Sequence, residues 1–359
     1  MTKRTLLDLD WTLILPVFVL VLLSLTTLFS ISFSLFRSQL IFLIISLFTF
    51  LFFSQVNYRI IKLYSFPIYI TSLVLLILVL VLGAATRGSV RWVEIWGIRI
   101  QFSEILKPFL LVSFASFLSS RENYSFKTIL LAFIFLTPIS LLIFIQPDLG
   151  NALIYISVAV LTLIVFGIPI RFFLAFGVPL GLLSPLIWRF LHDYQKQRII
   201  TFLNPQDPLG FSYNAIQSVI AVGSGMFFGK GLGQGTQSAL RFLPERHTDF
   251  IFATLSEELG FVGSLIVILC FAFLLFRIFK IFSNSQETFP KIFAISAFSI
   301  ILLQAFVNIG MNIGILPIVG ITLPFVSYGG SSLLSSFILL GLVSSISRKS
   351  DEDNVLEIK

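Results

Sequence analysis

Long apolar stretches recur along almost the whole chain, and short polar segments separate them. A helix that crosses a lipid bilayer needs about 20 mostly apolar residues. The pattern therefore predicts an all-α fold, a polytopic integral membrane protein with about ten transmembrane helices in a single transmembrane domain over residues 1–359. The predicted spans are residues 11–33, 37–55, 63–84, 104–120, 127–146, 149–168, 171–190, 249–281, 291–314 and 328–347.

The longest polar segment is the loop at about residues 191–248, between the seventh and eighth predicted spans. Apolar residues in its middle, at 213–221, predict an amphipathic helix that lies on the membrane surface. Glycines follow at 223–235, and Gly229-Lys230-Gly231 lacks the Ser or Thr of a phosphate-binding loop. We interpret this stretch as flexible backbone at the membrane surface and expect no nucleotide cofactor.

Composition narrows the class of protein further. Charged residues make up 11% of the chain and hydrophobic residues 57%, whereas about 25% of a soluble domain is charged. An ordinary soluble enzyme, a disordered chain and a secreted disulfide scaffold are thereby excluded. With a single cysteine, Cys270, and two histidines, the chain cannot assemble a Cys/His zinc site. We interpret the net charge of +7 as membrane orientation and expect no nucleic-acid partner.

Lysine and arginine in the short loops predict that both termini are cytoplasmic and that the long 191–248 loop is outside. Four cations oppose this orientation from the outer side, namely Arg87, Arg91, Arg99 and Lys107. An anionic ligand at the outer face would explain them. The alternative is that their side chains extend along apolar surface to the membrane interface.

Acidic side chains also gather at the outer ends of the predicted spans. Glu104 and Lys107 are three residues apart on a helix and can pair, either as a structural ion pair or as the charged wall of an outer cavity. Asp148 lies between two spans and can cap the second of them, a role that is compatible with a place in the same wall. Glu257 and Glu258 lie deeper, and for these we favour a structural role.

Asp249 precedes an apolar run at the outer mouth of the eighth span. A helix N-terminus would lower the pKa of its carboxyl group, whereas burial would raise it, and the sequence does not decide between them. Near the C-terminus, Pro317, Pro324 and Gly329-Gly330 interrupt an apolar stretch that also holds Ser327 and Tyr328. This favours a re-entrant loop that lines the outer cavity over a simple outer loop.

Five groups of polar, glycine and proline residues recur between the predicted spans. They are Gly88 with Arg91-Trp92 and Gln101–Lys107, Gln146–Gly150, Asn204–Gly210 with Tyr213, Gln217 and Ser218, Leu243–Phe252 with Glu257–Gly260, and Asn308–Asn312 with Leu323–Ser332. In these motifs the chain resembles the SEDS family (shape, elongation, division and sporulation) over nearly its whole length, and its elongation branch (RodA-type) more than its division branch (FtsW-type). Phe102, where the family usually has proline, and Asn151, where it usually has threonine, are departures that remove no charged group.

The resemblance implies a peptidoglycan glycosyltransferase that polymerises lipid II at the outer face of the bacterial cytoplasmic membrane, for cell elongation and rod shape. It implies as partners a class B penicillin-binding protein transpeptidase and other elongation-complex membrane proteins. It also makes Asp249 the essential residue, which we interpret as the general base. The candidate substrate-binding residues are Arg91, Glu104, Lys107, Asp148, Arg241, Arg246, His247, Ser327 and Tyr328.

Several questions stay open at this point. The diphosphate leaving group needs cations, and a divalent cation such as magnesium or manganese would serve, but the sequence does not decide whether a metal is required. A lipid II flippase, the division-specific polymerase and a catalytically silent scaffold are the alternative functions. A flippase would tend to show repeated halves, which we do not find in the sequence.

Overall fold

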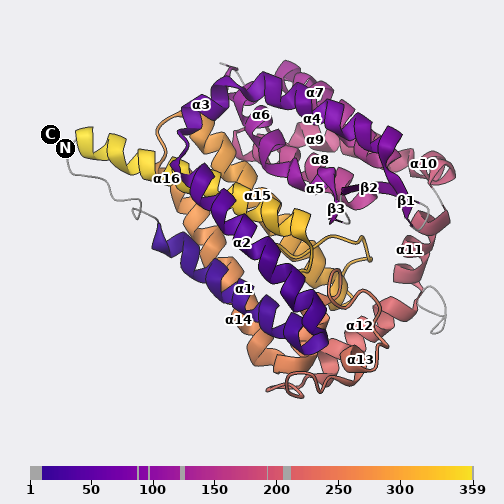
Figure 1. Ribbon diagram of the computed structural model, residues 1–359. Coiled ribbons are helices and arrows are strands. Elements are labelled where there is room, and N and C mark those ends of the chain that lie inside the picture. The colour runs from indigo at the N-terminus through magenta and orange to yellow at the C-terminus, as the bar shows by residue number, and fades with distance from the viewer. Residues whose placement is uncertain are drawn as a thin grey trace.

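A computed structural model describes residues 10–86, 89–95, 98–121, 126–191, 193–204 and 212–357 (Figure 1). Arg87, Gly88 and most of the predicted Asn204–Gly210 motif lie outside the described residues. The helices are α1 (Trp11–Ile31), α2 (Phe33–Gln55), α3 (Tyr58–Leu63), α4 (Ser65–Leu82), α5 (Phe102–Ile105), α6 (Lys107–Ser119), α7 (Phe126–Ile145), α8 (Leu149–Val165), α9 (Ile170–Leu182), α10 (Ser184–Phe190), α11 (Asp193–Leu203), α12 (Tyr213–Ser224), α13 (Thr236–Ala239), α14 (Ile251–Asn284), α15 (Thr288–Asn312) and α16 (Gly330–Glu357). The strands are β1 (Ala84–Thr86), β2 (Ser89–Ile95) and β3 (Ile98–Ile100).

Helices lie over all of the predicted spans, so the predicted polytopic helical membrane fold is confirmed. Within the described residues, seven helices are long and apolar enough to cross a membrane, and α6 and α8 are shorter apolar helices. The predicted span 171–190 consists of α9 and α10, which meet at Leu183. The amphipathic helix predicted at 213–221 is α12.

The centre of the bundle is formed by α15 and α16. Their apolar windows are 67% and 83% buried, whereas no other candidate span exceeds 39%, so the outer helices present most of their apolar surface to lipid. The last helix packs along α2, and α15 packs against α14, α8 and α6. Buried serines on α16, such as Ser335 and Ser345, allow the close approach of helices that small residues favour in membranes.

Hydrogen bonds place the start of α1 and the end of α16 at the same end of the bundle. Asp10 Oδ2 accepts hydrogen bonds from Arg277 Nη2 of α14 at 2.7 Å and from Ser347 Oγ of α16 at 3.1 Å. This arrangement is the one that an even number of spans produces. The opposite end carries the sheet, the turn before α8, and helices α12 and α13 (Figure 1).

The small antiparallel sheet was not predicted, because its strands are three to seven residues long and lie in what the hydropathy pattern treats as a loop. Its order is β1-β2-β3, with Ala84 opposite Trp92 and Val93 opposite Ile100. The β-branched residues of β2 suit an extended backbone. The sheet fixes the direction of Arg91, which lies in the middle of β2.

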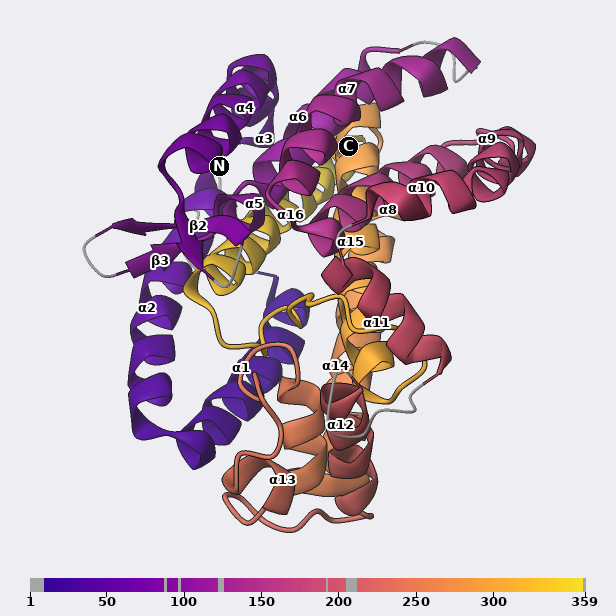
Figure 2. The same ribbon diagram turned by 90° about the vertical axis from the view of Figure 1, so that its right-hand side faces the viewer.

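The apolar stretch between α15 and α16 is interrupted, as its prolines and glycines predict. Residues 313–329 form no helix, yet Leu323, Phe325 and Val326 are buried. Non-helical backbone at such depth must find partners in the protein. Asn308 Nδ2 donates to the carbonyl of Ile321 at 2.7 Å, and Ser24 Oγ donates to that of Val326 at 2.6 Å. Figure 2 shows this segment between the sheet on one side and α11 on the other.

Helix α14 is broken at Gly260, which has φ 68° and ψ −160°. A Cβ atom at this position would collide with the backbone nitrogen of Gly229, so both the conformation and the space require glycine. The carbonyls near the break accept hydrogen bonds from the glycine-rich stretch, with Lys230 N on Glu257 at 3.0 Å and Gly231 N on Glu258 at 3.0 Å. The predicted span 249–281 therefore consists of a short outer helix and a longer spanning helix.

Candidate active site

Asp249 lies in the turn that precedes α14, and two asparagines of α15 hold its backbone. Its carbonyl oxygen accepts hydrogen bonds from Asn308 Nδ2 and Asn312 Nδ2, both at 3.0 Å. The N-cap of α14 is Phe250, with no side-chain capping hydrogen bond. The Asp249 carboxylate therefore does not cap the helix. It points toward Gly320 in the segment between α15 and α16, where its Oδ2 lies 3.4 Å from the position that a Cβ would occupy.

Burial decides the protonation equilibrium of Asp249. The side chain is partly buried, and burial, followed by the negative charge of Glu245, raises the pKa of the carboxyl group from 3.8 to about 6. Arg198 and Arg91 act in the opposite direction without compensating for burial. A carboxylate with a pKa of about 6 is ionised at neutral pH and is still basic enough to accept a proton.

Arg91 reaches from β2 to the turn between α7 and α8. Its Nε donates to the carbonyl of Gln146 at 3.2 Å, another guanidinium nitrogen donates to the carbonyl of Pro147, and Nη1 lies 4.0 Å from Asp148 Oδ1. Both Arg91 and Asp148 are among the charged groups that act on Asp249. The structure therefore brings three of the predicted site residues together.

Asp148 is also the N-cap of α8, which was the alternative interpretation of this residue. It accepts hydrogen bonds from the backbone and side-chain nitrogens of Asn151 at 3.3 and 2.8 Å, and from Gln101 Nε2 at 3.0 Å. Asn151, one of the departures from the family pattern, thus supplies two of the donors. The carboxylate is buried, and these bonds compensate for its desolvation.

Glu104 and Lys107 form an ion pair inside the protein, with 2.6 Å between Oε1 and Nζ and side-chain exposures of 6% and 3%. The nearby Tyr155 hydroxyl donates to the carbonyl of Ser103 at 3.1 Å. This geometry favours the structural ion pair over direct contact with a substrate. The predicted binding role of the two residues stays a prediction.

Ser327, Tyr328 and His247 join the irregular segment to the turn of Asp249. The Tyr328 backbone nitrogen donates to the His247 carbonyl at 2.8 Å, and their rings meet edge to face with centroids 5.5 Å apart. Ser327 Oγ donates to the Thr248 carbonyl at 2.7 Å and accepts from the backbone nitrogen of Leu323 at 2.8 Å. In this geometry these groups hold the backbone around Asp249.

Two of the candidate substrate-binding cations, Arg246 and Arg241, have neighbours other than Asp249. Arg246 donates to the carbonyl of Ser238, and Arg241 is exposed on the surface. Burial, followed by the positive charge of Arg241, lowers the pKa of Arg246, and Glu258 is its main acidic neighbour. These two arginines therefore belong with the glycine-rich stretch, because the chain from 225 to 246 packs against the outer part of α14.

That stretch is held in place by the two glutamates of α14, so its interpretation as flexible backbone is wrong. Glu257 Oε1 accepts from Lys230 Nζ at 3.0 Å and from the Gln237 backbone nitrogen at 2.9 Å. Glu258 Oε1 accepts from Ser30 Oγ at 2.6 Å and from the Gly233 backbone nitrogen at 3.0 Å. The structural role that we favoured for both carboxylates agrees with these bonds.

Sequence reasoning missed Arg198 of α11, which acts on Asp249 more strongly than Arg91 does. The cations of the 191–248 loop were set aside because long loops obey the orientation rule poorly. It also left Asn308 and Asn312 out of the site, although both lie in a motif that it singled out. Their spacing of four residues places them on the same face of a helix.

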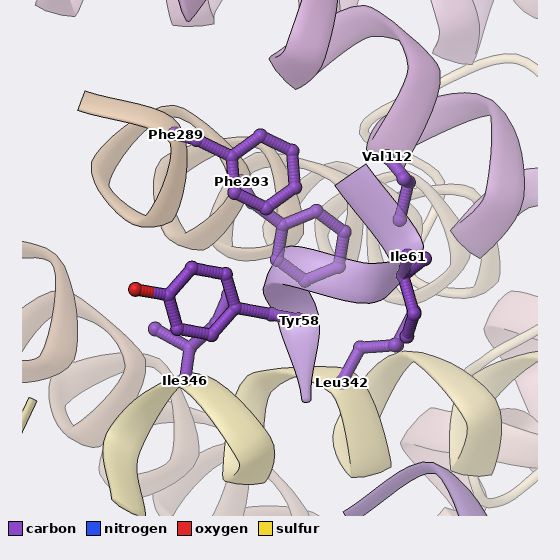
Figure 3. Close-up of a pocket in the computed structure, with 7 residues that line it drawn as sticks. All are labelled: Tyr58, Ile61, Val112, Phe289, Phe293, Leu342 and Ile346. Atoms are coloured by element: carbon purple, nitrogen blue, oxygen red, sulfur yellow. The ribbon is translucent and has the colours of Figure 1, made fainter. Parts of the chain in front are cut away.

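Two further observations concern where a metal ion or another ligand could bind. Among the residues that the structure describes, no three His, Cys, Asp or Glu side chains are grouped so that they could hold a metal ion by themselves. A small cavity of about 10 Å³ lies at the other end of the bundle, between α3, α6, α15 and α16, where Tyr58 stacks on Phe289 (Figure 3). Its lining is apolar, so it is unsuited to a charged substrate.

Comparison with known proteins places this chain in a family. The model of the FtsW/RodA/SpoVE family, described as "Cell cycle protein", matches residues 4–352. The peptidoglycan glycosyltransferase MrdB of Escherichia coli K12 is 42% identical over 282 residues, which cover 78% of this chain and 76% of MrdB. Stage V sporulation protein E of Bacillus subtilis is 36% identical over 320 residues, which cover 88% of this chain and 87% of that protein.

Solved structures agree with the sequence comparison. A chain from the structure "Structural coordination of polymerization and crosslinking by a peptidoglycan synthase complex" has a TM-score of 0.84 and 29% identity, covering 96% of this chain and 99% of that one. The rod shape determining protein RodA of Thermus thermophilus has a TM-score of 0.73 and 28% identity, covering 96% and 98%. The chain is therefore a member of the FtsW/RodA/SpoVE family, the SEDS proteins, and a multi-pass protein of the cytoplasmic membrane.

Proposed function

We propose that this protein is a peptidoglycan glycosyltransferase that polymerises lipid II at the outer face of the cytoplasmic membrane. The observation that carries the proposal is the partly buried Asp249 carboxylate, on which the positive charges of Arg198 and Arg91 act. The chain that holds it is 42% identical to MrdB. Four FtsW proteins compared with this chain are 35–39% identical to it, which favours a role in cell elongation over one in division.

The proposed reaction joins two lipid-linked sugars. The hydroxyl group of one sugar attacks the anomeric carbon of the other, and the bond from that carbon to the lipid diphosphate breaks. Asp249 accepts the proton that the hydroxyl loses, a step that typically contributes about 10²–10⁴-fold to the rate. Asn308 and Asn312 hold the backbone of Asp249, so the base is held in place before the substrate arrives.

The diphosphate leaving group gains negative charge as the bond breaks, so cations near Asp249 are needed. The groups that act most strongly on Asp249 are two guanidinium groups, Arg198 and Arg91, and two further carboxylates, Glu245 and Asp148. With Asp249 included, carboxylates outnumber guanidinium groups here. This excess of negative charge fits a divalent cation, magnesium or manganese, whose ligands would come from the diphosphate and from carboxylates other than the proton acceptor Asp249. Such an ion would neutralise charge on the leaving group.

The proposed partners follow from the same comparisons. The structure that this chain resembles at a TM-score of 0.84 is described as a complex that coordinates polymerisation with crosslinking. We therefore expect a class B penicillin-binding protein transpeptidase as partner, with other membrane proteins of the elongation complex, and lipid II as substrate.

The test uses the purified protein with its transpeptidase partner, lipid II and magnesium or manganese in detergent, and measures glycan polymer. Asp249→Ala should abolish polymer, whereas Glu94→Gln, a change to an exposed carboxylate on β2, should leave it unchanged. Polymer that persists in Asp249→Ala would overturn the assigned base. Absence of polymer under every condition, together with lipid II crossing vesicle membranes, would favour the flippase.

A further inference from the structure

Arg198 approaches Asp249 from a part of the chain that is distant in sequence. It belongs to α11, and its Nη1 donates to the Val319 carbonyl at 2.9 Å. This bond orients the guanidinium group along the segment between α15 and α16, directly before Gly320. Figure 2 shows α11 lying beside that segment.

The space in front of Gly320 separates the Asp249 carboxylate from the Arg198 guanidinium group. A Cβ at this residue would lie 3.4 Å from Asp249 Oδ2 and 3.9 and 4.0 Å from the terminal nitrogens of Arg198. The glycine has φ +76°, a conformation that side chains rarely adopt, so the space in front of it stays open. A negatively charged group placed here would contact the guanidinium group while its neighbour faced the carboxylate.

Position distinguishes Arg198 from the other cations considered for the site, because its terminal nitrogens lie beside the space at Gly320. Arg91 donates to the backbone carbonyls of the turn before α8 and lies 4.0 Å from Asp148. Lys107 is buried against Glu104, and Arg246 donates to the carbonyl of Ser238. Arg198 is partly exposed and exerts a stronger attraction on Asp249 than Arg91 does.

We propose that Arg198 binds the diphosphate of the lipid-linked sugar donor across Gly320 from Asp249. The proposal rests on the glycosyltransferase function proposed above. A guanidinium group presents a planar fork of N–H donors that matches phosphate oxygens, and it stays charged at every pH at which the enzyme works. Arg198 thus stabilises the negative charge that develops on the leaving group.

The test measures binding to the purified full-length protein in detergent. The two probes are undecaprenyl diphosphate and the uncharged alcohol undecaprenol. Arg198→Gln should weaken binding of the diphosphate roughly tenfold or more, the effect of losing a charge-assisted hydrogen bond, and leave binding of the alcohol unchanged. Lys196→Gln is the matched control, because it removes the same charge from the same helix at a residue that pairs with Asp193. Arg198→Lys should bind the diphosphate with intermediate affinity.

Three results would overturn the proposal. Unchanged diphosphate affinity in Arg198→Gln would do so, as would an equal loss of both probes in Arg198→Gln and Arg198→Lys. The third is a shift of the pH–rate profile in Arg198→Gln without a loss of diphosphate affinity, because Arg198 would then act only on the charge of Asp249. Wild-type protein that binds the diphosphate through Arg198 but makes no glycan would instead overturn the glycosyltransferase and retain the phosphate site.

Discussion

The pKa of Asp249 predicts how polymerisation depends on pH. A general base works only when it is ionised, so kcat/KM should rise with pH, reach half of its maximum near pH 6 and level off about one pH unit higher. At pH 5 a carboxyl group with a pKa of about 6 is ionised in roughly 9% of molecules, whereas one at the ordinary value of 3.8 is ionised in roughly 94%. The raised pKa should therefore reduce the rate at pH 5 about tenfold relative to an aspartate of ordinary pKa.

A neighbouring charge gives this prediction a direction that can be tested. Glu245 is the largest cause after burial of the raised pKa of Asp249, so Glu245→Gln should lower that pKa and move the acid limb to lower pH. The exposed Glu94→Gln should leave the midpoint where it is. The assay is the initial rate of glycan synthesis at subsaturating lipid II, with the transpeptidase partner present, over a range of about pH 4.5–8.

Two results would refute this reasoning. A rate that does not change between pH 5 and pH 7 would mean that no group with a pKa of about 6 governs the reaction. An acid limb that moves to higher pH in Glu245→Gln would mean that Glu245 acts on Asp249 by something other than its negative charge.

Three further predictions concern stability and folding; the first two are measured as thermal unfolding of the detergent-purified protein, and the third as the yield of folded protein. Asp249→Asn should be more stable than the wild type at pH 7.5, by at most about 3 kcal/mol, because ionising a carboxyl whose folded pKa is raised from 3.8 to about 6 costs stability. That cost develops between these two pH values, so the gain should disappear below pH 3.8, and a less stable variant at pH 7.5 would contradict the prediction. Glu104→Gln should lose about 3–5 kcal/mol of unfolding free energy, because Lys107 is left charged and buried. The double variant Glu104→Gln with Lys107→Met should recover most of that loss. Equal stability of the single and the double variant would show that the pair is not coupled. Gly260→Ala should prevent accumulation of folded protein, because its Cβ meets backbone, whereas Gly177→Ala, with nothing within 4 Å, should not; a stable Gly260→Ala would contradict the break in α14.

The helices and several features of the site could be predicted from local sequence. Apolar runs alone locate the spans, prolines and glycines locate the interruption before α16, and the pattern of Ile216, Val219 and Ile220 locates α12. The position of Asp148 between two apolar runs predicts a cap, and the spacing of Glu104 and Lys107 predicts their pair. These features depend on residues that are close along the chain.

The sheet and the break in α14 were missed for a common reason. Strands of three residues carry too little pattern to be recognised, and the break at Gly260 depends on the approach of Gly229, which lies some thirty residues earlier in the chain. The glycine-rich stretch was interpreted as flexible because its anchors, Glu257 and Glu258, lie on a helix that follows it.

Membrane insertion and helix formation depend on composition over about 20 neighbouring residues, so the order of amino acids settled both for this protein. The pKa of Asp249, by contrast, depends on the tertiary structure. Its raised pKa comes from burial and from Glu245, and it is opposed by Arg198 and Arg91, which α11 and β2 bring to the same point. Electrostatic interaction falls with distance and grows as water is excluded, and both quantities exist only once the helices have packed. Tertiary packing likewise places Arg198 and Arg91 near Asp249 and Arg246 near the glycine-rich stretch.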